Sequence, residues 1–409
     1  MVTDISTSPI AVPPMGLERH YWRPDPRLSI SRTSRARETG EYHSAVPPKI
    51  AEYEFSAPAD IAAILEESAH ALGVLDAYAA AKFGVKSREL GPMSAILLRT
   101  ESTSSSQIEN LTVGARKLAL QELGEGHGGN AEIVVGNVHA MEASLEFARE
   151  FDERNLLAMH KALLLAQYGE APFAGHYRDQ LVWVGGSRYG PRQATHVGPQ
   201  PELIEACITD VLEFFRRDDL PVIMQCAIGH AQFETIHPFV DGNGRVGRAL
   251  VHAVLRNKGL VGNITPPVSA GLLVDTARYF AALETFRKGN ARPIVECFAD
   301  ACRFAATTGT RLIDDLDEQL SVARDRLHGV RKDAAVWKVL PLLIEQPIIN
   351  REYLIRKIGL SPMSARRAID TLAKRGIVVQ TMGGRRNAVW EHKGILSVLD
   401  EYGTQYRRT

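Results

Sequence analysis

The sequence predicts a mainly α-helical protein that contains one β-hairpin and ends in a basic module. Over Pro58–Thr308, apolar residues recur with the three- and four-residue spacing of helices almost throughout. The β-like runs in this stretch are Leu181–Val184 and Ala194–Val197, with a Gly-rich segment between them. Residues 331–409 hold 15 Lys and Arg against 7 Asp and Glu, a net charge of +8, and residues 1–330 hold 33 against 41, a net charge of −8. This asymmetry indicates a separate C-terminal module.

The composition indicates a cytoplasmic protein with two or more domains. A chain of 409 residues exceeds the usual size of one domain, and 45% apolar residues suffice for a sizeable core. No run approaches the roughly 18 apolar residues of a membrane span, so we expect no membrane association. The N-terminus lacks the layout of a secretory signal. The four cysteines form no Cys-x-x-Cys pair and are expected to be reduced core thiols: Cys207, Cys226, Cys297 and Cys302.

The elements are expected in a simple order along the chain. Prolines dominate the first 50 residues and predict an extended arm without regular structure through much of its length. A charged connecting helix is expected over Gly309–Arg331. The helices expected between these two segments are Pro58–Phe83, Leu97–Leu123, Ala131–Arg149, Asn155–Gln167, Glu202–Arg216, Pro221–Ile236, Arg245–Gly259, Thr276–Lys288 and Ala291–Thr307.

A string of twelve residues, His237–Arg248, has the composition of a nucleotide phosphate site. Its second residue is a proline, which disfavours helical backbone in the residue before it, so the apolar helix Pro221–Ile236 should end there. The turn that contains Gly242 and Gly244 precedes the next helix. Backbone N–H groups and the positive end of a helix dipole therefore meet at this turn, and the glycines let the backbone approach a phosphate closely.

The side chains of this string suit nucleotide chemistry. His237 is able to accept a proton near neutral pH. Asp241 is a hard oxygen ligand of the kind that Mg²⁺ prefers, and Asn243 can donate to a phosphate oxygen. Arg245 and Arg248 carry forked guanidinium groups that suit phosphate oxygens and developing negative charge. Together these residues predict the attack of a hydroxyl group on a nucleotide phosphate.

The same string resembles the Fic family motif, His-x-Phe-x-Asp/Glu-Gly-Asn-Gly-Arg-x-x-Arg, and matches it at every defined position. The resemblance implies a Fic-type helical bundle and an enzyme that transfers AMP from ATP to a Ser, Thr or Tyr hydroxyl of a target protein. It implies that His237 is the general base and that Asp241 holds Mg²⁺ or Mn²⁺. The residues implied to bind the nucleotide are Gly242, Asn243, Gly244, Arg245 and Arg248, the last of them at the γ-phosphate end.

A second string, Ser105–Asn110, fits the inhibitory pattern of the same family, Ser/Thr-x-x-x-Glu-Gly/Asn. The resemblance implies that Glu109 pairs with Arg248 in the place of the γ-phosphate and blocks productive ATP binding. The string lies near the start of the expected helix Leu97–Leu123. An alternative stays open, because Ser106 and Glu109 also fit a capping box, in which the carboxylate closes back on the helix start. The inhibitory residues are Ser105, Glu109 and Asn110.

The expected hairpin between Leu181 and Val197 is similar to the flap that Fic proteins carry beside the active site. By resemblance, the flap aligns the hydroxyl-bearing segment of the target through strand-like main-chain pairing. A plain surface loop is the alternative. Arg178 and Arg188 are interpreted as structural or solvated residues. The residues expected to dock the target are Val182, Trp183, Val184, Gly185 and Gly186.

The C-terminal segment, residues 333–409, resembles a winged helix-turn-helix. Its basic side chains suit DNA, and protein docking or dimerisation is an equal alternative, so DNA and a second copy of the chain are both open as partners. Three helices are expected over Ala334–Glu345, Arg351–Ile358 and Ser364–Arg375, with two strands over Ile377–Gln380 and Ala388–Trp390. The basic residues are Arg366, Arg367, Lys374 and Arg375 on the third helix and Arg385 and Arg386 at the wing tip.

Two classes of function compete. The first is an autoinhibited protein adenylyltransferase, and within it an enzyme that removes AMP or uses another donor stays open. The second is a DNA-binding regulator whose Fic-like core senses a nucleotide. The complete motif favours the first, since a sensor needs no general base. The expected domains are an arm at 1–50, an N-terminal helical region at 51–150, a catalytic core at 151–308, a connector at 309–332 and a winged helix at 333–409.

Overall fold

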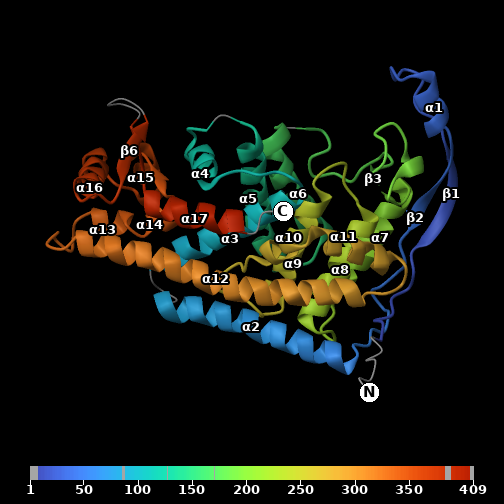
Figure 1. The fold of residues 1–409 in the computed structure, drawn as a ribbon, viewed down its shortest axis with the longest axis horizontal. Helices are drawn as coiled ribbons and strands as arrows, with labels where there is room; N and C mark the ends of the chain where they lie inside the picture. The colour runs from blue at the N-terminus through green and yellow to red at the C-terminus, as the bar shows by residue number, and fades with distance from the viewer. Residues whose placement is uncertain (1–7, 85–87, 127, 170, 383–387, 406–409) are drawn as a thin grey trace. The chain divides into compact units, whose positions relative to one another are not determined.

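The structure is a computed structural model that describes residues 8–84, 88–126, 128–169, 171–382 and 388–405. The chain is mainly helical with a few short strands, as the sequence predicts (Figure 1). It divides into two compact units. Unit 1 comprises Met1–Ala69, Ala140–Lys258 and Thr276–Asp300, and unit 2 comprises His70–His139, Gly259–Asp275 and Ala301–Thr409. Each unit is built from segments that are distant in the sequence.

Unit 1 is organised around helices α8 (Val222–Ile236) and α9 (Asn243–Asn257), which lie side by side (Figure 1). Helix α8 is buried along almost its whole length, because its sequence is apolar on nearly every side. Helices α7 (Ile204–Arg216) and α11 (Thr276–Arg287) pack against α8, and α6 (Glu153–Tyr168) packs against α9. The aromatic side chains that fill the surrounding core are Phe147, Phe151, Phe214, Phe215, Phe233 and Phe239.

The N-terminal region contains regular structure that the prolines did not predict. Strands β1 (Gly16–Trp22) and β2 (Gly40–Val46) pair antiparallel, from Gly16 opposite Val46 to Trp22 opposite Gly40, and α1 (Arg32–Glu38) connects them. The expectation of an extended arm is therefore wrong for these residues. The prolines flank the strands and leave every ladder N–H in place: Pro13 and Pro14 precede β1, Pro24 and Pro26 follow it, and Pro47 and Pro48 follow β2.

The expected hairpin is present in unit 1. Strands β3 (Trp183–Val184) and β4 (His196–Val197) pair antiparallel, and a short 3₁₀ helix, η1 (Pro191–Gln193), lies in their connection. The strands are shorter than expected, with two residues each. Strand β2 of the N-terminal sheet packs against β4 and η1.

Unit 2 is organised around α3 (Leu90–Ile108). Helices α10 (Val268–Val274), α14 (Leu342–Glu345) and α17 (Lys393–Gln405) all pack against α3. One hydrophobic core includes Leu97 of α3 and residues such as Leu343, Leu372 and Leu396 of the C-terminal segment. The C-terminal segment therefore shares a continuous hydrophobic core with α3, and the expected domain boundaries stay a prediction.

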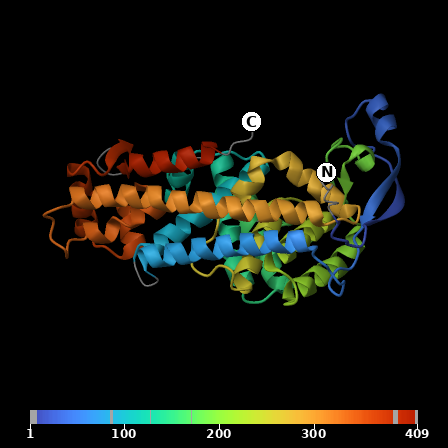
Figure 2. The ribbon, with the colours of Figure 1, turned by 60° about the horizontal axis from the view of Figure 1, so that its bottom comes forward.

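Two long helices support the core of unit 2. The unit 2 portions of α2 (Ala59–Phe83) and α12 (Arg292–Arg326) run side by side (Figure 2). The Tyr78 hydroxyl and the Lys82 ammonium both bond to the Asp314 carboxylate. Helix α12 merges the expected helix Ala291–Thr307 with the expected connector, so no break occurs at residue 308. Gly309 lies inside α12, where the absence of a side chain allows close packing against α2. A Cβ at that position would come within 3.1 Å of Leu75 Cδ2.

Two further differences from expectation concern helices of this region. The expected helix Leu97–Leu123 is two helices, α3 and α4 (Ala115–Leu123). Helix α5 (Asn130–Phe147) is close to its expected range, and α10 was not expected. Among the helices of the described residues, none has both the length and the apolar composition needed to cross a bilayer.

The C-terminal segment contains the expected helices and wing strands together with two further elements. The expected first helix is split at Pro341 into α13 (Val336–Val339) and α14. Helices α15 (Arg351–Ile358) and α16 (Pro362–Lys374) follow, and strands β5 (Ile348–Ile349), β7 (Val389–Glu391) and β6 (Val379–Met382) form a sheet in that order. Strand β5 and α17 were not expected. Arg385 and Arg386 lie outside the described residues, and the winged-helix classification stays a prediction.

Candidate active site

His237 ends α8 in a left-handed backbone conformation, with φ 51° and ψ 61°. Its backbone N–H donates to the Phe233 carbonyl at 2.9 Å and closes the last turn of the helix. Apart from Asn110, it is the one non-glycine residue with positive φ in the described part of the chain. A left-handed backbone costs a residue with a Cβ about 1–2 kcal/mol, and such strain collects at functional sites.

The turn before α9 is shaped for close approach of an anion. Gly242 is the N-cap residue, with φ 82° and ψ 7°, and a Cβ there would come within 2.6 Å of Leu163 Cδ2. No side chain of the described residues caps this helix. The first N–H groups of a helix have no partner inside it, so those of Asn243, Gly244 and Arg245 remain available to a ligand. The helix begins two residues before the expected Arg245.

The Asn243 side chain bonds to the backbone of the motif loop. Its Nδ2 donates to the Phe239 carbonyl and its Oδ1 accepts from the Phe239 N–H, both at 2.9 Å. The side chain therefore closes the loop between His237 and α9. This contact uses one of the two N–H donors of Nδ2, and a contribution of Asn243 to nucleotide binding stays a prediction.

The Asp241 carboxylate lies beside this turn and is partly exposed, at 38% of its side chain. It accepts from the Gly242 N–H at 2.7 Å and from the Tyr168 hydroxyl at 3.1 Å, and Arg245 Nη2 lies 3.4 Å away. Mg²⁺ in nucleotide enzymes binds one or two carboxylates together with phosphate oxygens and waters, and Asp241 fits that pattern. Within the described residues, no cluster of three or more His, Cys, Asp or Glu side chains is able to hold a metal. A metal ion bound to Asp241 would therefore need the phosphate oxygens of a nucleotide as further ligands.

Both motif arginines are buried in the first turns of α9. Arg245 bonds to Gln167 Oε1 at 3.3 Å and pairs with Asp241, so its guanidinium is fixed before any ligand binds. Arg248 is among the largest fully buried side chains of the protein. A buried guanidinium is costly without anionic or polar partners, and it binds a carboxylate or phosphate strongly once water is excluded.

Two residues outside the motif hold its loop, and the sequence analysis missed one of them, His160. His160 Nδ1 accepts from the Gly175 N–H at 3.0 Å, so its Nε2 carries the proton and donates to the Asp241 carbonyl at 3.1 Å. Burial lowers the pKa of His160 to about 4, which keeps the ring neutral. Arg178 Nε donates to the His237 carbonyl and Nη2 donates to the Pro199 carbonyl, both at 2.8 Å. The structural interpretation of Arg178 is confirmed.

The hairpin that carries β3 and β4 is braced by the N-terminal sheet. The Thr195 N–H donates to the Val184 carbonyl at 2.9 Å, and the Gly198 N–H donates to the Val182 carbonyl at 3.1 Å. The rings of Trp22 and Trp183 meet edge to face at 5.5 Å. Gly185 and Gly186 follow β3 with φ 76° and 69°, and a Cβ at either position would clash with the opposite arm of the hairpin. Val184, Gly185 and Gly186 are exposed.

The Ser105–Asn110 string lies at the C-terminal end of α3 and not near a helix start. Glu109 is the C-cap residue, and Asn110 follows with φ 62°. The Leu111 N–H donates to the Ser106 carbonyl at 3.0 Å and the Asn110 N–H donates to the Gln107 carbonyl at 2.9 Å, which together form a Schellman motif. The capping-box interpretation is therefore wrong. The pattern allows Gly or Asn after the Glu because both tolerate this left-handed position.

Other contacts of α3 anchor the string within unit 2. Ser105 is buried, whereas Glu109 and Asn110 are exposed. Asn137 Nδ2 donates to the Ser102 carbonyl at 2.7 Å, and the Glu101 carboxylate accepts from the Ser269 N–H at 2.8 Å. The carboxyl end of α3 is therefore held by buried polar contacts.

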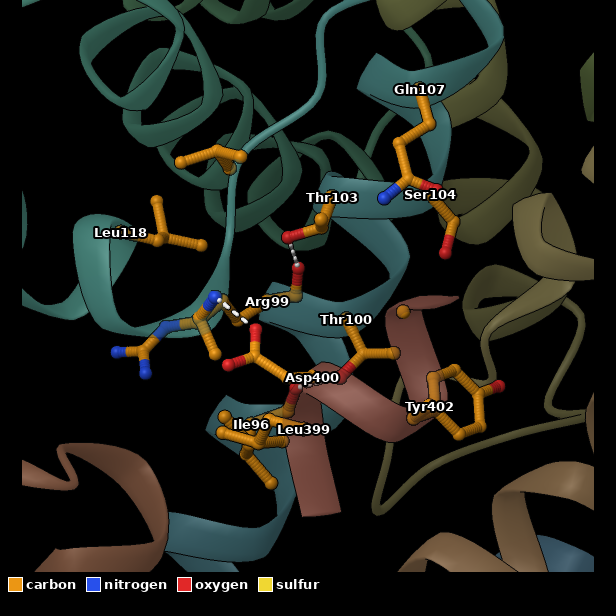
Figure 3. Close-up of a pocket in the computed structure, with 13 residues that line it drawn as sticks. Ile96, Arg99, Thr100, Thr103, Ser104, Gln107, Leu118, Leu399, Asp400 and Tyr402 are labelled. Carbon is orange, nitrogen blue, oxygen red and sulfur yellow. Dashed lines mark hydrogen bonds between the residues drawn. The ribbon is translucent and has the colours of Figure 1, made fainter. Parts of the chain in front are cut away.

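A small cavity of about 50 Å³ lies on another face of α3 (Figure 3). Arg99, Thr103 and Gln107 of α3 line it, together with Leu118 of α4 and Asp400 of α17. Asp400 Oδ1 accepts from the Ala115 N–H at 2.8 Å, at the first turn of α4. The cavity is far below the roughly 300 Å³ of a small-molecule site, so it is a packing gap between three helices.

Comparison with known proteins agrees with the motif. Residues 150–255 match the Fic/DOC family. Protein adenylyltransferase fic-1 of Caenorhabditis elegans is 30% identical over 175 residues, which cover 40% of this chain and 31% of that protein. A probable protein adenylyltransferase of Aquifex aeolicus is 35% identical over 86 residues, which cover 21% of this chain and 25% of that protein. The match thus spans about a third or less of each curated relative.

A solved structure extends the likeness to most of the fold. A Fic family protein from Desulfovibrio desulfuricans superposes with a TM-score of 0.54 at 20% identity, over 83% of this chain and 98% of that chain. At this identity the superposition shows a common fold. The stretch that matches the family, residues 150–255, contains α8, the loop that begins at His237 and almost all of α9. Residues 150–255 of this chain therefore match the Fic/DOC family, and the motif lies within them at the junction of α8 and α9.

Proposed function

We propose that this protein is a protein adenylyltransferase, which transfers AMP from ATP to a Ser, Thr or Tyr hydroxyl of a target protein. One observation carries the proposal: a single loop joins a proton acceptor, His237, to the uncapped N-terminus of α9. The adenylyltransferase relatives support the same activity. A general base beside an anion site is the arrangement that phosphoryl-group transfer to a hydroxyl requires.

In this proposal each group of the loop has one task. The N–H groups at the start of α9 and the guanidinium of Arg248 hold the triphosphate, and His237 accepts the proton of the target hydroxyl. A bond forms between the hydroxyl oxygen and the α-phosphorus, and the bond from that phosphorus to the bridging oxygen breaks as pyrophosphate leaves. Mg²⁺ or Mn²⁺ on Asp241 would neutralise charge on the phosphates. The exposed residues of the hairpin, Val184, Gly185 and Gly186, would align the target segment.

We further propose that Glu109 restrains this activity by taking the place of the γ-phosphate at Arg248. The support is the family-like pattern, the exposure of Glu109 at the end of α3 and the removal of the capping-box alternative. Bidentate pairing of Arg with carboxylate resembles its pairing with phosphate, so the competition is chemically sound. The proposal of a cytoplasmic location is supported by the cysteines, which form no disulfide: Cys207, Cys226, Cys297 and Cys302.

Labelled ATP tests the activity directly. Incubation with a mixture of cellular proteins and ATP labelled at the α-phosphate should leave label on protein, and mass spectrometry should find AMP on a hydroxyl side chain. Label retained from the γ-phosphate would instead indicate kinase chemistry. Loss of AMP from a pre-modified protein would indicate the removal reaction.

Exposed basic residues favour DNA as a second partner. Arg366, Arg367 and Lys374 of α16 and the adjacent Arg375 are all exposed. Such a helix face can meet the phosphates and major groove of a duplex. We propose that this face binds duplex DNA, and the salt dependence of binding described below separates that role from protein docking.

A further inference from the structure

Glu234 faces the imidazole of His237 across the last turn of α8. Its Oε2 lies 3.6 Å from His237 Nδ1, and the two side chains are 10% and 19% exposed. Neither Nδ1 of His237 nor Oε1 of Glu234 has a hydrogen-bond partner among the residues that the structure describes. The carboxylate of Glu234 therefore lies close enough to His237 Nδ1 for a charge interaction, at a distance slightly longer than a hydrogen bond.

The surroundings keep Glu234 ionised. Burial by itself raises the pKa of a carboxyl group, but the interactions with His237, and then with the charges of His230 and Arg248, lower the pKa of Glu234 to about 2. Arg287 on α11 faces the same carboxylate. Burial lowers the pKa of Arg287, and the charge of Glu234 opposes that shift in part. His196 on β4 also faces the pair, and burial lowers its pKa to about 3, so it adds no charge near neutral pH.

Gly247 leaves the space that this carboxylate occupies. A Cβ at residue 247 would come within 3.0 Å of Glu234 Oε1 and within 3.1 Å of both His230 Nδ1 and Phe233 Cδ1. Gly247 lies between Arg245 and Arg248, at a position that the family motif leaves undefined. The absence of a side chain at residue 247 of α9 therefore leaves room for the Glu234 carboxylate.

We propose that Glu234 is a positioning residue for the general base, which keeps a proton on His237 Nδ1 and leaves Nε2 to accept the proton of the target hydroxyl. The inference rests on the proposed transfer function. Glu234 takes no proton itself; it stabilises the imidazolium that forms when the hydroxyl proton moves to Nε2. The C-terminal end of the α8 dipole favours the same cationic form.

In a competing role, the negative charge of Glu234 would orient the guanidinium of Arg248 for nucleotide binding. The two roles have different kinetic consequences. A positioning residue for the base changes kcat and the pH at which the rate falls. A counter-charge for Arg248 changes KM for ATP and leaves the shape of the pH profile in place.

The test uses the full chain with Glu109→Gly present, so that a transfer rate is measurable. In this background Glu234→Gln should lower kcat about 10- to 100-fold, within the range of general-base contributions, and leave KM for ATP within about twofold. Loss of the carboxylate disfavours the imidazolium, so the acidic limb of the profile should move about one pH unit lower. The deficit in rate should therefore shrink as pH falls. Glu234→Asp keeps the charge, so its acidic limb should lie close to that of the Glu234 protein.

Glu284→Gln is the matched control, because it removes an exposed carboxylate from α11, near Arg287. It should change neither kcat nor the profile. A wild-type pH profile in Glu234→Gln, with a raised KM for ATP, would overturn the proposal in favour of the counter-charge.

A second readout is independent of transfer. Nitrogen NMR of the histidine rings in the full chain, with the His237 signals assigned by their loss in His237→Ala, shows which ring nitrogen carries the proton. The neutral ring should carry it on Nδ1, and Glu234→Gln should shift the population toward the form protonated on Nε2, whereas an unchanged population would reject the pairing. Absence of transfer in every variant, with the shifted population present, would reject the proposed function and leave the pairing standing.

Discussion

His160 and Phe239 stack face to face, with 3.7 Å between ring centroids and 8° between ring planes. The stack places a neutral imidazole from α6 beneath the motif loop, and its Nε2–H holds the carbonyl of Asp241. The loop is thus supported by a helix that lies far from it in the sequence.

This stack predicts a pH-dependent stability. The pKa of His160 is about 4 in the folded chain and about 6.5 when the chain unfolds, because burial disfavours its charged form. The unfolded state therefore binds more protons below pH 6.5, and stability falls as pH drops from 6.5 toward 4. Urea unfolding should show His160 contributing a loss of about 2 kcal/mol between pH 6.5 and 5. His160→Phe should remove that part of the slope, and an unchanged slope would contradict the burial argument.

His237→Ala should abolish AMP transfer and leave the fold and nucleotide binding in place, because it removes the proton acceptor alone. The measurement is α-label transfer together with circular dichroism and ATP binding. Full activity of this variant would reject the proposed mechanism.

Transfer should require Mg²⁺ or Mn²⁺, and Asp241→Ala should lose that requirement together with most of the rate. Tyr168→Phe is the matched comparison, since it removes the hydroxyl bonded to the Asp241 carboxylate and retains the carboxylate itself. It should keep the metal dependence, with the rate measured after chelation and after metal is added back. Metal-independent transfer by the wild type would exclude a metal on Asp241.

Glu109→Gly should raise transfer strongly, since Arg248 would then be available to the γ-phosphate and the α-phosphate could sit in line with the hydroxyl. Glu109→Gln should also activate, because it removes the charge with little change of shape at the end of α3. Adding Arg248→Ala to Glu109→Gly should cancel the gain. Rates at or below wild type in both Glu109 variants, with folding verified, would reject autoinhibition.

DNA binding by α16 should weaken steeply with salt through counterion release. The double change Arg366→Ala with Arg367→Ala should reduce affinity and lower the salt slope, as measured by fluorescence anisotropy on a duplex. Arg311→Ala is the control, an exposed arginine of α12 that should leave binding unchanged. Absence of binding at low salt, together with a dimer in sedimentation, would favour the docking interpretation.

The sequence predicted what local chemistry determines. Pro238 and the glycines of the motif fix the junction of α8 and α9, so the positions of His237 and Asp241 could be read from neighbouring residues. His160 and Arg178 could not, because their contacts join distant segments. Glu234 has a readable signal in the sequence, because it lies three residues before His237 at a helix end.

Several errors have definite physical causes. Strand β1 is exposed along most of its length, so it shows no alternation of apolar and polar residues. The break after α3 depends on the left-handed conformation of Asn110, which a helical pattern does not reveal. The contact of the Asn243 side chain with the backbone of Phe239 is visible only in the folded loop.

The continuous core that joins α3 to the C-terminal segment has a consequence for dissection of the protein. A truncation before residue 333 would strip apolar cover from α3 and leave the Ala115 N–H without Asp400. Such a fragment would therefore have a destabilised α3. A change in its activity could not be attributed to the loss of the C-terminal segment alone. By linkage, a ligand that stabilises the intact C-terminal segment would also stabilise the helix end that carries Glu109.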